Sequence, residues 1–208
     1  MGSPFDSTLG VVDPAVLVPL KAFRHAKGRL AGHLSPDERH RLAVGMAARV
    51  VGAAAPLHVY VACDDDEVAS WSESVGADVL WGPGLGLNGA IDQGVTTLAG
   101  KGHDHVVILH GDLPLARDLG SLVWPDEIVI VPDRRSDGTN VLSRPASSRV
   151  AASYGGGSFA RHHAAAVATG LPVTVRHDPL LELDIDTVTD CRHPLVADVV
   201  ASILTPSG

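Results

Sequence analysis

Three aspartates occupy positions where a carboxylate needs a cation. Asp112 follows the aliphatic run VVIL after only two residues, and such a run is typical of a buried strand. Asp184 and Asp186 lie two residues apart in LDID, so their side chains point to the same face of an extended segment. Carboxylate oxygens are the ligands that Mg²⁺ prefers. The three aspartates therefore favour a magnesium site, although Asp184 and Asp186 could instead cap the helix that follows them.

A group of cations follows the first strand candidate. The segment KAFRHAKGRL carries Lys21, Arg24, Lys27 and Arg29 in a chain whose formal net charge is −8. Cations grouped at the end of a strand can bind the phosphates of a nucleotide, although the GxxxxGK[ST] pattern of a P-loop is absent. The alternative interpretation of this stretch is a solvated basic loop.

Glycine-rich segments offer two further binding elements. In GPGLGLNGAIDQG the glycines allow close approach of a ligand, and Asn88 could cap the next helix. In YGGGSFARHHAAA, Ser158 follows three glycines and opens a helix whose free N–H groups and dipole favour an anion. Thr139 of SDGTN could add a second hydroxyl. Ser158 could also be no more than a helix cap.

Other chemistry is poorly supported. No pair among the 11 histidines has HExxH spacing, and His162 and His163 cannot face one metal from adjacent helix positions. We expect most histidines at the surface. The two cysteines, Cys63 and Cys191, form no CxxC motif, which predicts reduced thiols rather than a zinc site. There is no GxSxG motif for covalent catalysis.

Composition limits the class of protein. The chain has 208 residues, of which 45% are hydrophobic and only 4% aromatic, so its core must consist mainly of Val, Leu, Ile and Ala. The acidic balance disfavours nucleic-acid binding. No apolar run is long enough for a membrane span, and the first residues do not resemble a secretory signal. We therefore expect a cytoplasmic protein that binds neither nucleic acid nor membrane.

Strand and helix patterns alternate along the chain, which predicts an α/β fold with a doubly wound, mostly parallel sheet. Ligands of such sheets lie beyond the carboxyl ends of the strands. We expect one domain over residues 1–208, with residues 1–14 as a flexible N-terminal segment. The predicted helices begin at the Ser35 capping box and at residues 64, 158 and 187, the last interrupted by Pro194. A further helix is predicted to follow GPGLGLNGA and to end near Gly100. The predicted strands are Val16–Pro19, Leu57–Ala62, Asp78–Trp81, His105–Leu109, Glu127–Val131, Asn140–Leu142 and Pro172–Arg176.

Together these segments resemble the guanylyltransferases of deazaflavin coenzyme (F-420) biosynthesis, which act on 2-phospho-L-lactate or phosphoenolpyruvate. The matching segments occur in family order: VLVPLKAFRHAKGRLA, GLNGAI, GDLPL, DGTN, YGGGSFARHHAAA and LDIDT. Each is weak alone, but the ordered set is fairly specific. The resemblance implies the compact fold of the nucleotide-diphospho-sugar transferases.

The resemblance also implies roles for the matched residues. Mg²⁺, expected as two ions per site, would be held by Asp112, Asp184 and Asp186. The acceptor's phosphate and carboxylate would be held by Thr139, Gly155 and Ser158. Nucleotide binding would fall to Lys21, Lys27, Arg29 and the Leu87–Asn88 loop near guanine, and the catalytic set would be Asp112, Lys27 and Arg29.

The implied reaction is attack of an acceptor phosphate oxygen on the α-phosphorus of GTP, with pyrophosphate leaving. That nucleophile is already anionic, so the lack of a catalytic dyad or triad is expected. Other nucleotidyltransferases, such as a molybdopterin guanylyltransferase or a sugar-phosphate cytidylyltransferase, are the nearest alternatives, but they open with a glycine-rich loop after the first strand. A glycosyltransferase with a DxD motif and a non-catalytic GTP-sensing module are further alternatives. The apolar C-terminal helix (residues 195–204) could serve a homodimer.

Overall fold

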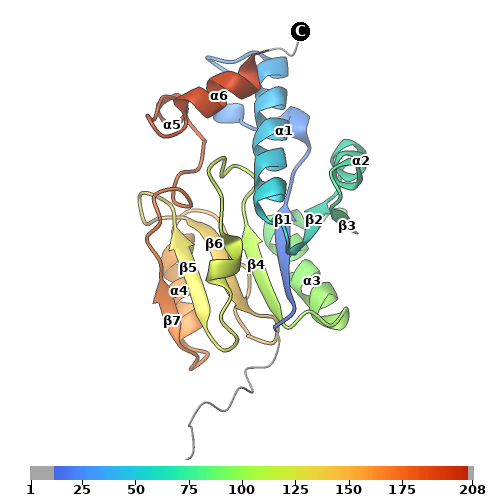
Figure 1. The fold of residues 1–208 in the computed structure, drawn as a ribbon, viewed down its shortest axis with the longest axis vertical. Coiled ribbons are helices and arrows are strands. Elements are labelled where there is room, and N and C mark those ends of the chain that lie inside the picture. Colours follow the sequence, from blue (N-terminus) through green and yellow to red (C-terminus); the bar gives the residue numbers. More distant parts are fainter. Residues whose placement is uncertain (1–11, 206–208) are drawn as a thin grey trace, which may run out of the picture.

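One mixed sheet organises the molecule (Figure 1). The computed structural model describes residues 12–205. Its strand order is β3-β2-β1-β4-β6-β5-β7. Only β6 is antiparallel to its neighbours, and the other pairs are parallel. The strands are β1 (Pro14–Pro19), β2 (His58–Cys63), β3 (Asp78–Trp81), β4 (His105–Leu109), β5 (Ile128–Pro132), β6 (Thr139–Pro145) and β7 (Val173–Val175). The predicted doubly wound, mostly parallel sheet is confirmed.

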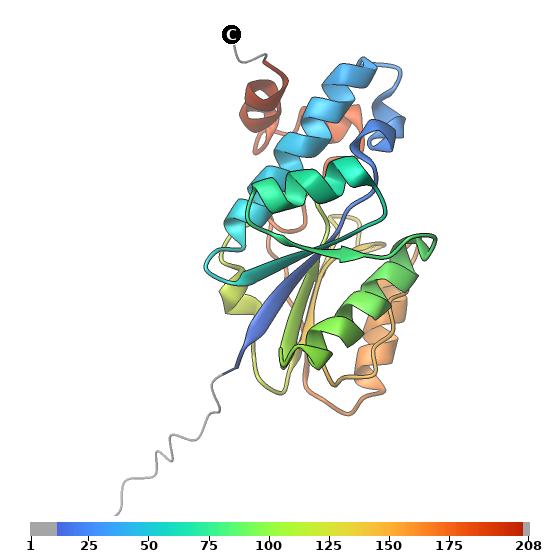
Figure 2. The ribbon, with the colours of Figure 1, turned by 90° about the vertical axis from the view of Figure 1, so that its right-hand side faces the viewer.

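Helices cover both faces of this sheet (Figure 2). The helices are α1 (Pro36–Ala53), α2 (Asp66–Ser74), α3 (Gly86–Gly100), α4 (Ser158–Val167), α5 (Val188–Cys191) and α6 (Ala197–Leu204), with short 3-10 turns η1 (Phe23–His25), η2 (Gly28–Leu30) and η3 (Leu119–Leu122). Alternate residues of β1 divide between two cores: Val16 and Val18 pack with α1 and α2, and Ala15 and Leu17 pack with α3 and α4. No helix among residues 12–205 is long and apolar enough to cross a membrane.

Most predicted elements are present, with shifted ends. The capping box at Ser35 is formed, and its side chain accepts a hydrogen bond from the Glu38 N–H. Of the expected flexible segment, residues 1–11 lie outside the described part of the chain, and Pro14 already belongs to β1. The predicted C-terminal helix is divided around Pro194 into α5 and α6.

Strand β6 is longer than predicted and is completely buried. Its polar residues obscured the aliphatic pattern, but each has partners inside the protein. The Ser143 hydroxyl donates to the Leu122 carbonyl at 2.7 Å, and the Arg144 guanidinium donates to the Ser148 carbonyl at 2.9 Å. The Arg144 Nε is buried without a partner among the described residues, but the bonds that the other polar groups make allow the strand to lie between β4 and β5.

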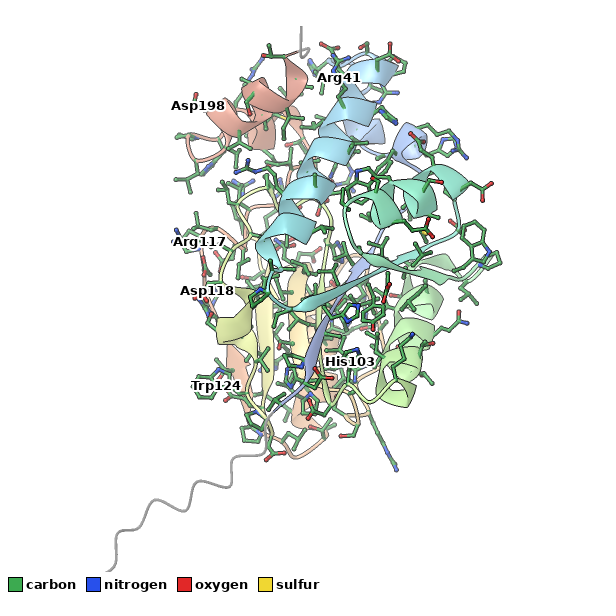
Figure 3. The ribbon with its side chains drawn as sticks, turned by 45° about the vertical axis from the view of Figure 1, so that its right-hand side comes forward. Arg41, His103, Arg117, Asp118, Trp124 and Asp198 are labelled. Carbon is green, nitrogen blue, oxygen red and sulfur yellow. The ribbon has the colours of Figure 1, made fainter. Side chains whose placement is uncertain are left out.

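The apolar side of α6 is used within the chain. Val196 and Val200 are buried with Leu42 and Met46 of α1 in a small third core. A side chain at Gly45 of α1 would meet Ile203 at 2.5 Å, so the absence of one allows the two helices to approach. Figure 3 shows Arg41 of α1 and Asp198 of α6 at the same end of the molecule. Helix α1 therefore covers part of the apolar surface that could serve a homodimer, whereas Leu195 is 48% exposed.

His105, at the start of β4, is fully buried and must be neutral. Its Nε2 lies 2.8 Å from the Ser143 Oγ, whose own hydrogen goes to Leu122, so Nε2 carries the proton. The opposite nitrogen, Nδ1, is buried without a partner. Burial lowers the pKa of His105 to about 4, with Asp104 opposing the shift and Arg144 adding to it.

Acid should therefore destabilise the fold through His105. The unfolded chain binds this proton near pH 6.5, whereas the folded protein resists it down to about pH 4. Stability is thus lost as the pH falls through this window, by up to about 3 kcal/mol. Urea unfolding at pH 7 and pH 4.5 should show a smaller loss in His105→Leu than in the parent. Equal losses in both proteins would contradict this assignment.

Candidate active site

The site lies where β1 and β4 end. These strands are parallel neighbours, so the segments that leave them emerge at the same edge of the sheet. The segment with Lys27 follows β1, and Asp112 follows β4. Strand β6 runs the other way, so it begins at this edge: after the Leu109–Val141 pair, the His110 N–H donates to the Asn140 carbonyl at 3.3 Å. Thr139, the first residue of β6, therefore lies beside the segment that carries Asp112.

Lys27 is the cation that meets the Asp112 carboxylate. Its ammonium donates to the Asp112 Oδ2 at 2.8 Å and to the Asp186 Oδ1 at 3.2 Å. The Lys27 side chain is only 8% exposed, and its backbone has a φ of 57°, a left-handed conformation that costs energy in a residue with a Cβ. Arg29, which is exposed, donates to the Asp186 Oδ2 at 3.1 Å. Two ion pairs to Lys27 offset the unfavourable backbone.

These contacts perturb both partners. Burial by itself lowers the pKa of Lys27, but the charges of Asp112 and Asp186 outweigh it and hold that pKa above its ordinary value. Burial by itself raises the pKa of Asp112, and the Lys27 ammonium brings it below the ordinary value. Both groups are therefore charged near neutral pH, and the pair is a fixed feature of the site.

The late LDID segment returns to this point. The Ile185 N–H donates to the Asp112 carbonyl at 3.2 Å, which places Asp184 and Asp186 on either side of Ile185 next to Asp112. Thr187, not an aspartate, caps α5, and its side chain accepts from the Asp190 N–H. The interpretation of Asp184 and Asp186 as a helix-capping pair is therefore wrong.

The carboxylate oxygens are ligands of the kind that a hard divalent cation prefers. Their arrangement, however, is not that of a complete metal site. The Asp112 Oδ1 is buried without a partner. Burial, followed by the neighbouring charges of Asp112, Asp186 and Asp133, raises the pKa of Asp184 to about 6. Among residues 12–205, however, no group of three His, Cys, Asp or Glu side chains is arranged to hold a metal ion. Lys27 supplies part of the countercharge instead.

Thr139 and Ser158 are in contact where β6 and α4 begin. The Thr139 N–H donates to the Ser158 Oγ at 3.0 Å, and both side chains are buried. Gly157 caps α4, so the interpretation of Ser158 as a simple helix cap is wrong. Gly155 has a φ of 119°, which a residue with a Cβ rarely adopts, and its carbonyl accepts from the Ser158 N–H at 3.0 Å. The three residues predicted for the acceptor thus lie together.

Two adjoining cavities open between this edge and α3. One, of about 250 Å³, is lined by residues that include Lys21, Leu87 and Asp64. The other, of about 340 Å³, is also lined by Lys21 and Leu87 and reaches Lys27, Asp112 and Asp186. The two cavities therefore connect a mostly apolar space to the charged cluster. Arg24 does not take part, because it pairs with Asp65 at 2.6 Å.

Asn88 has a different position from the one predicted. The N-cap of α3 is Leu85, so Asn88 lies within the helix and does not cap it. Its amide accepts from the Tyr154 N–H at 2.8 Å and donates to the Tyr154 carbonyl at 3.4 Å. Asn88 thus joins the helix beside the cavities to the glycine-rich segment that carries Gly155.

Sequence reasoning missed His162. Its side chain is completely buried, contrary to the surface position expected for most histidines, and its ring lies against Thr139 and Ser153. The available signal was its spacing of four residues from Ser158, which places both on one face of α4. The ion pair between Arg134 and Asp190 was also missed, because neither residue belongs to a recognisable motif.

Comparison with known proteins agrees with this geometry. Residues 14–196 match the family model described as guanylyl transferase CofC like. The chain belongs to this family. It is 35% identical over 191 residues to a phosphoenolpyruvate guanylyltransferase of Sphaerobacter thermophilus, covering 85% of this chain and 90% of the relative. It is 33% identical over 182 residues to a 2-phospho-L-lactate guanylyltransferase of Methanothermobacter thermautotrophicus, covering 84% and 80%.

Solved structures confirm the fold of this guanylyltransferase. A putative nucleotide-diphospho-sugar transferase from Desulfovibrio desulfuricans superposes with a TM-score of 0.72 over 93% of this chain and 94% of the other, at 15% sequence identity. Such a likeness at low identity concerns the fold alone. The nucleotide-diphospho-sugar transferase fold and the family resemblance inferred from the sequence are both confirmed.

Replacing Lys27 should show how much the neighbouring carboxylates destabilise the protein when they have no cation. Lys27→Met leaves Asp112 and Asp186 without their shared partner, and we expect the free energy of unfolding at pH 7 to fall by about 3 kcal/mol. Lys101→Met is the matched control, because Lys101 is exposed with its Nζ 5.7 Å from the centre of the Tyr60 ring. It should cost about 1 kcal/mol or less. Urea unfolding of both variants makes the comparison, and equal losses would rule out the role of Lys27.

Proposed function

We propose that this guanylyltransferase transfers GMP from GTP to the phosphate of phosphoenolpyruvate, or of 2-phospho-L-lactate, and releases pyrophosphate in the biosynthesis of coenzyme F-420. Relatives similar over most of the chain carry these names. The observation that carries the proposal is the position of the Lys27–Asp112 pair and of the Thr139 and Ser158 hydroxyls at the same edge of the sheet. A cationic nucleotide side and a hydroxyl-lined acceptor side suit a reaction between two phosphates.

The reaction needs charge compensation more than proton transfer. An acceptor phosphate is anionic at neutral pH, so its oxygen can attack the α-phosphorus of GTP without a general base. Repulsion between the two polyanions is then the main obstacle. Lys21, Lys27 and Arg29 offset charge on the nucleotide and on the departing pyrophosphate in this proposal. Thr139, Gly155 and Ser158 hold the acceptor through hydroxyls and backbone N–H groups.

Mg²⁺ belongs to this proposal, with two ions per site held by Asp112, Asp184 and Asp186. When bound, the metal shields phosphate charge and aligns the attacking and leaving oxygens. The unpartnered Asp112 Oδ1 and the raised pKa of Asp184 support this assignment. The apolar cavity lined by Leu87 is proposed for the guanine, with Asn88 next to it in α3.

The remaining assignments are also proposals. The chain acts as a single domain, since its described residues share one sheet. A cytoplasmic location agrees with two cysteines that are free in the structure. A homodimer would have to use a surface other than the covered side of α6, and light scattering of the purified protein measures it.

A competition assay tests the function directly. Purified protein is incubated with GTP, Mg²⁺ and equal amounts of phosphoenolpyruvate and 2-phospho-L-lactate, and the products are identified by mass spectrometry. We expect pyrophosphate together with a guanylylated acceptor, mainly that of phosphoenolpyruvate. Reactions with molybdopterin or a sugar phosphate in place of these acceptors are the controls. Product from a control alone, or binding of GTP without any pyrophosphate, would refute the proposal.

Removal of Asp112 tests the metal. Asp112→Ala should lower kcat by about a hundredfold or more, the size of effect seen when one electrostatic contact to a transition state is lost. Mg²⁺ with GTP should raise the Tm of the parent but not that of the variant, because binding stabilises only the protein that binds. Asp126→Ala, at an exposed position, is the control. Near-normal turnover of the Asp112 variant at saturating Mg²⁺ would contradict the assignment.

A further inference from the structure

His162 connects the two segments that form the acceptor side. It lies on α4, and its side chain has no exposed surface. One ring nitrogen, Nε2, accepts a hydrogen bond from the Ser153 N–H at 2.9 Å. The other, Nδ1, lies 2.9 Å from the Thr139 Oγ1. The ring thus bridges the start of β6 and the glycine-rich segment before α4.

These contacts define the protonation state of the ring. Since Nε2 accepts from a backbone N–H, it carries no hydrogen, and the single proton of the neutral imidazole is on Nδ1. Nδ1–H then donates to the Thr139 Oγ1. A cationic ring would set two N–H groups against each other at Ser153. Burial, with smaller effects of Arg161, His110 and Arg144, lowers the pKa of His162 to about 4, so the ring is neutral at physiological pH.

The direction of this hydrogen bond decides how the hydroxyls can act. The Thr139 Oγ1 is already an acceptor, so its own hydrogen is free for another group. The Ser158 Oγ is likewise an acceptor, from the Thr139 N–H at 3.0 Å. In the part of the chain that the structure describes, neither hydroxyl donates to a protein acceptor. Two buried hydroxyls with free hydrogens are suited to an anion and poorly suited to a cation.

The surrounding contacts hold the ring in place. The Tyr154 ring packs edge-on against His162, with ring centres 4.6 Å apart, and lies tilted against the His110 ring, with ring centres 4.9 Å apart. Asn88 binds the Tyr154 backbone from the other side. His162 therefore holds Ser153 and Asn88 of α3 holds Tyr154, the two residues directly before Gly155.

We propose that His162 is a positioning residue for the acceptor. The bond that Nε2 accepts from Ser153 fixes the proton on Nδ1, and the Nδ1–H in turn makes the Thr139 hydroxyl a donor to the anionic acceptor. The inference rests on the proposed function, because it assigns the acceptor to this side. It adds a residue that need not touch the substrate.

A matched pair of variants separates the two hydrogen bonds. In His162→Asn the amide nitrogen takes the place of Nδ1 and still donates to Thr139, whereas in His162→Gln the amide oxygen takes the place of Nε2 and accepts from Ser153. Each variant keeps one bond, so both should lose similar stability. His163→Asn, at the adjacent and partly exposed position, is the control.

We expect these variants to change the KM for the acceptor but not the KM for GTP. His162→Gln should raise the KM for phosphoenolpyruvate by about tenfold, the effect of losing one hydrogen bond to a charged group. The KM for GTP should change by less than about twofold, and His162→Asn should restore most of the acceptor KM. In a Thr139→Val background, His162→Gln should have no further effect on the acceptor KM. Equal effects of Asn and Gln, or a parallel rise in the GTP KM, would overturn the proposal.

A spectroscopic measurement keeps the inference testable apart from activity. Long-range ¹H–¹⁵N NMR spectra of the histidine rings should show His162 as the neutral Nδ1–H tautomer from pH 6 to pH 8, and Thr139→Val should perturb its Nδ1 resonance. An Nε2–H tautomer or a cationic ring would overturn the proposal even in an active enzyme. If no acceptor is guanylylated but the tautomer is found, the function proposed above is wrong while the assigned ring state stands.

Discussion

The whole site depends on keeping a partly buried carboxylate charged at the end of a central strand. Asp112 cannot remain ionised there without a cation close by, and Lys27 provides one from the segment that follows the neighbouring strand. This contact is possible only because β1 and β4 are parallel and adjacent, so that both chain segments leave the sheet at the same edge. Lys27 accepts a left-handed backbone to reach it. The strand order, the conformation of the segment that carries Lys27 and the charge balance of the site therefore depend on one another.

The other parts of the site are attached to this centre by backbone contacts. The Ile185 N–H fastens the acidic segment to the Asp112 carbonyl, and the antiparallel β6 brings Thr139 alongside. Asn88 then connects the cavity side to the glycine-rich segment through Tyr154. The sides proposed for the nucleotide and for the acceptor are thereby joined through Asn88 and Tyr154. Such a connection suits a transfer in which two anions must be aligned and in which no proton has to be moved.

Sequence patterns predicted the architecture well where a strand is purely aliphatic. The runs before Cys63 and Asp112 could be read with nearly correct ends, as could the capping box at Ser35. Strand β6 was underestimated because Ser143 and Arg144 are polar, and only their partners in the folded chain make their burial affordable. Local propensity carries no information about such distant partners.

The sequence by itself determined the family, the order of the elements and the residue types of the site, because these follow from local patterns and ordered motifs. It could not determine which of these residues contact each other. The pairing of Lys27 with Asp112 and Asp186, the link from Asn88 to Tyr154 and the burial of His162 join residues far apart in the chain. Their distances are set by the sheet order and by the antiparallel insertion of β6, and only the tertiary structure contains both.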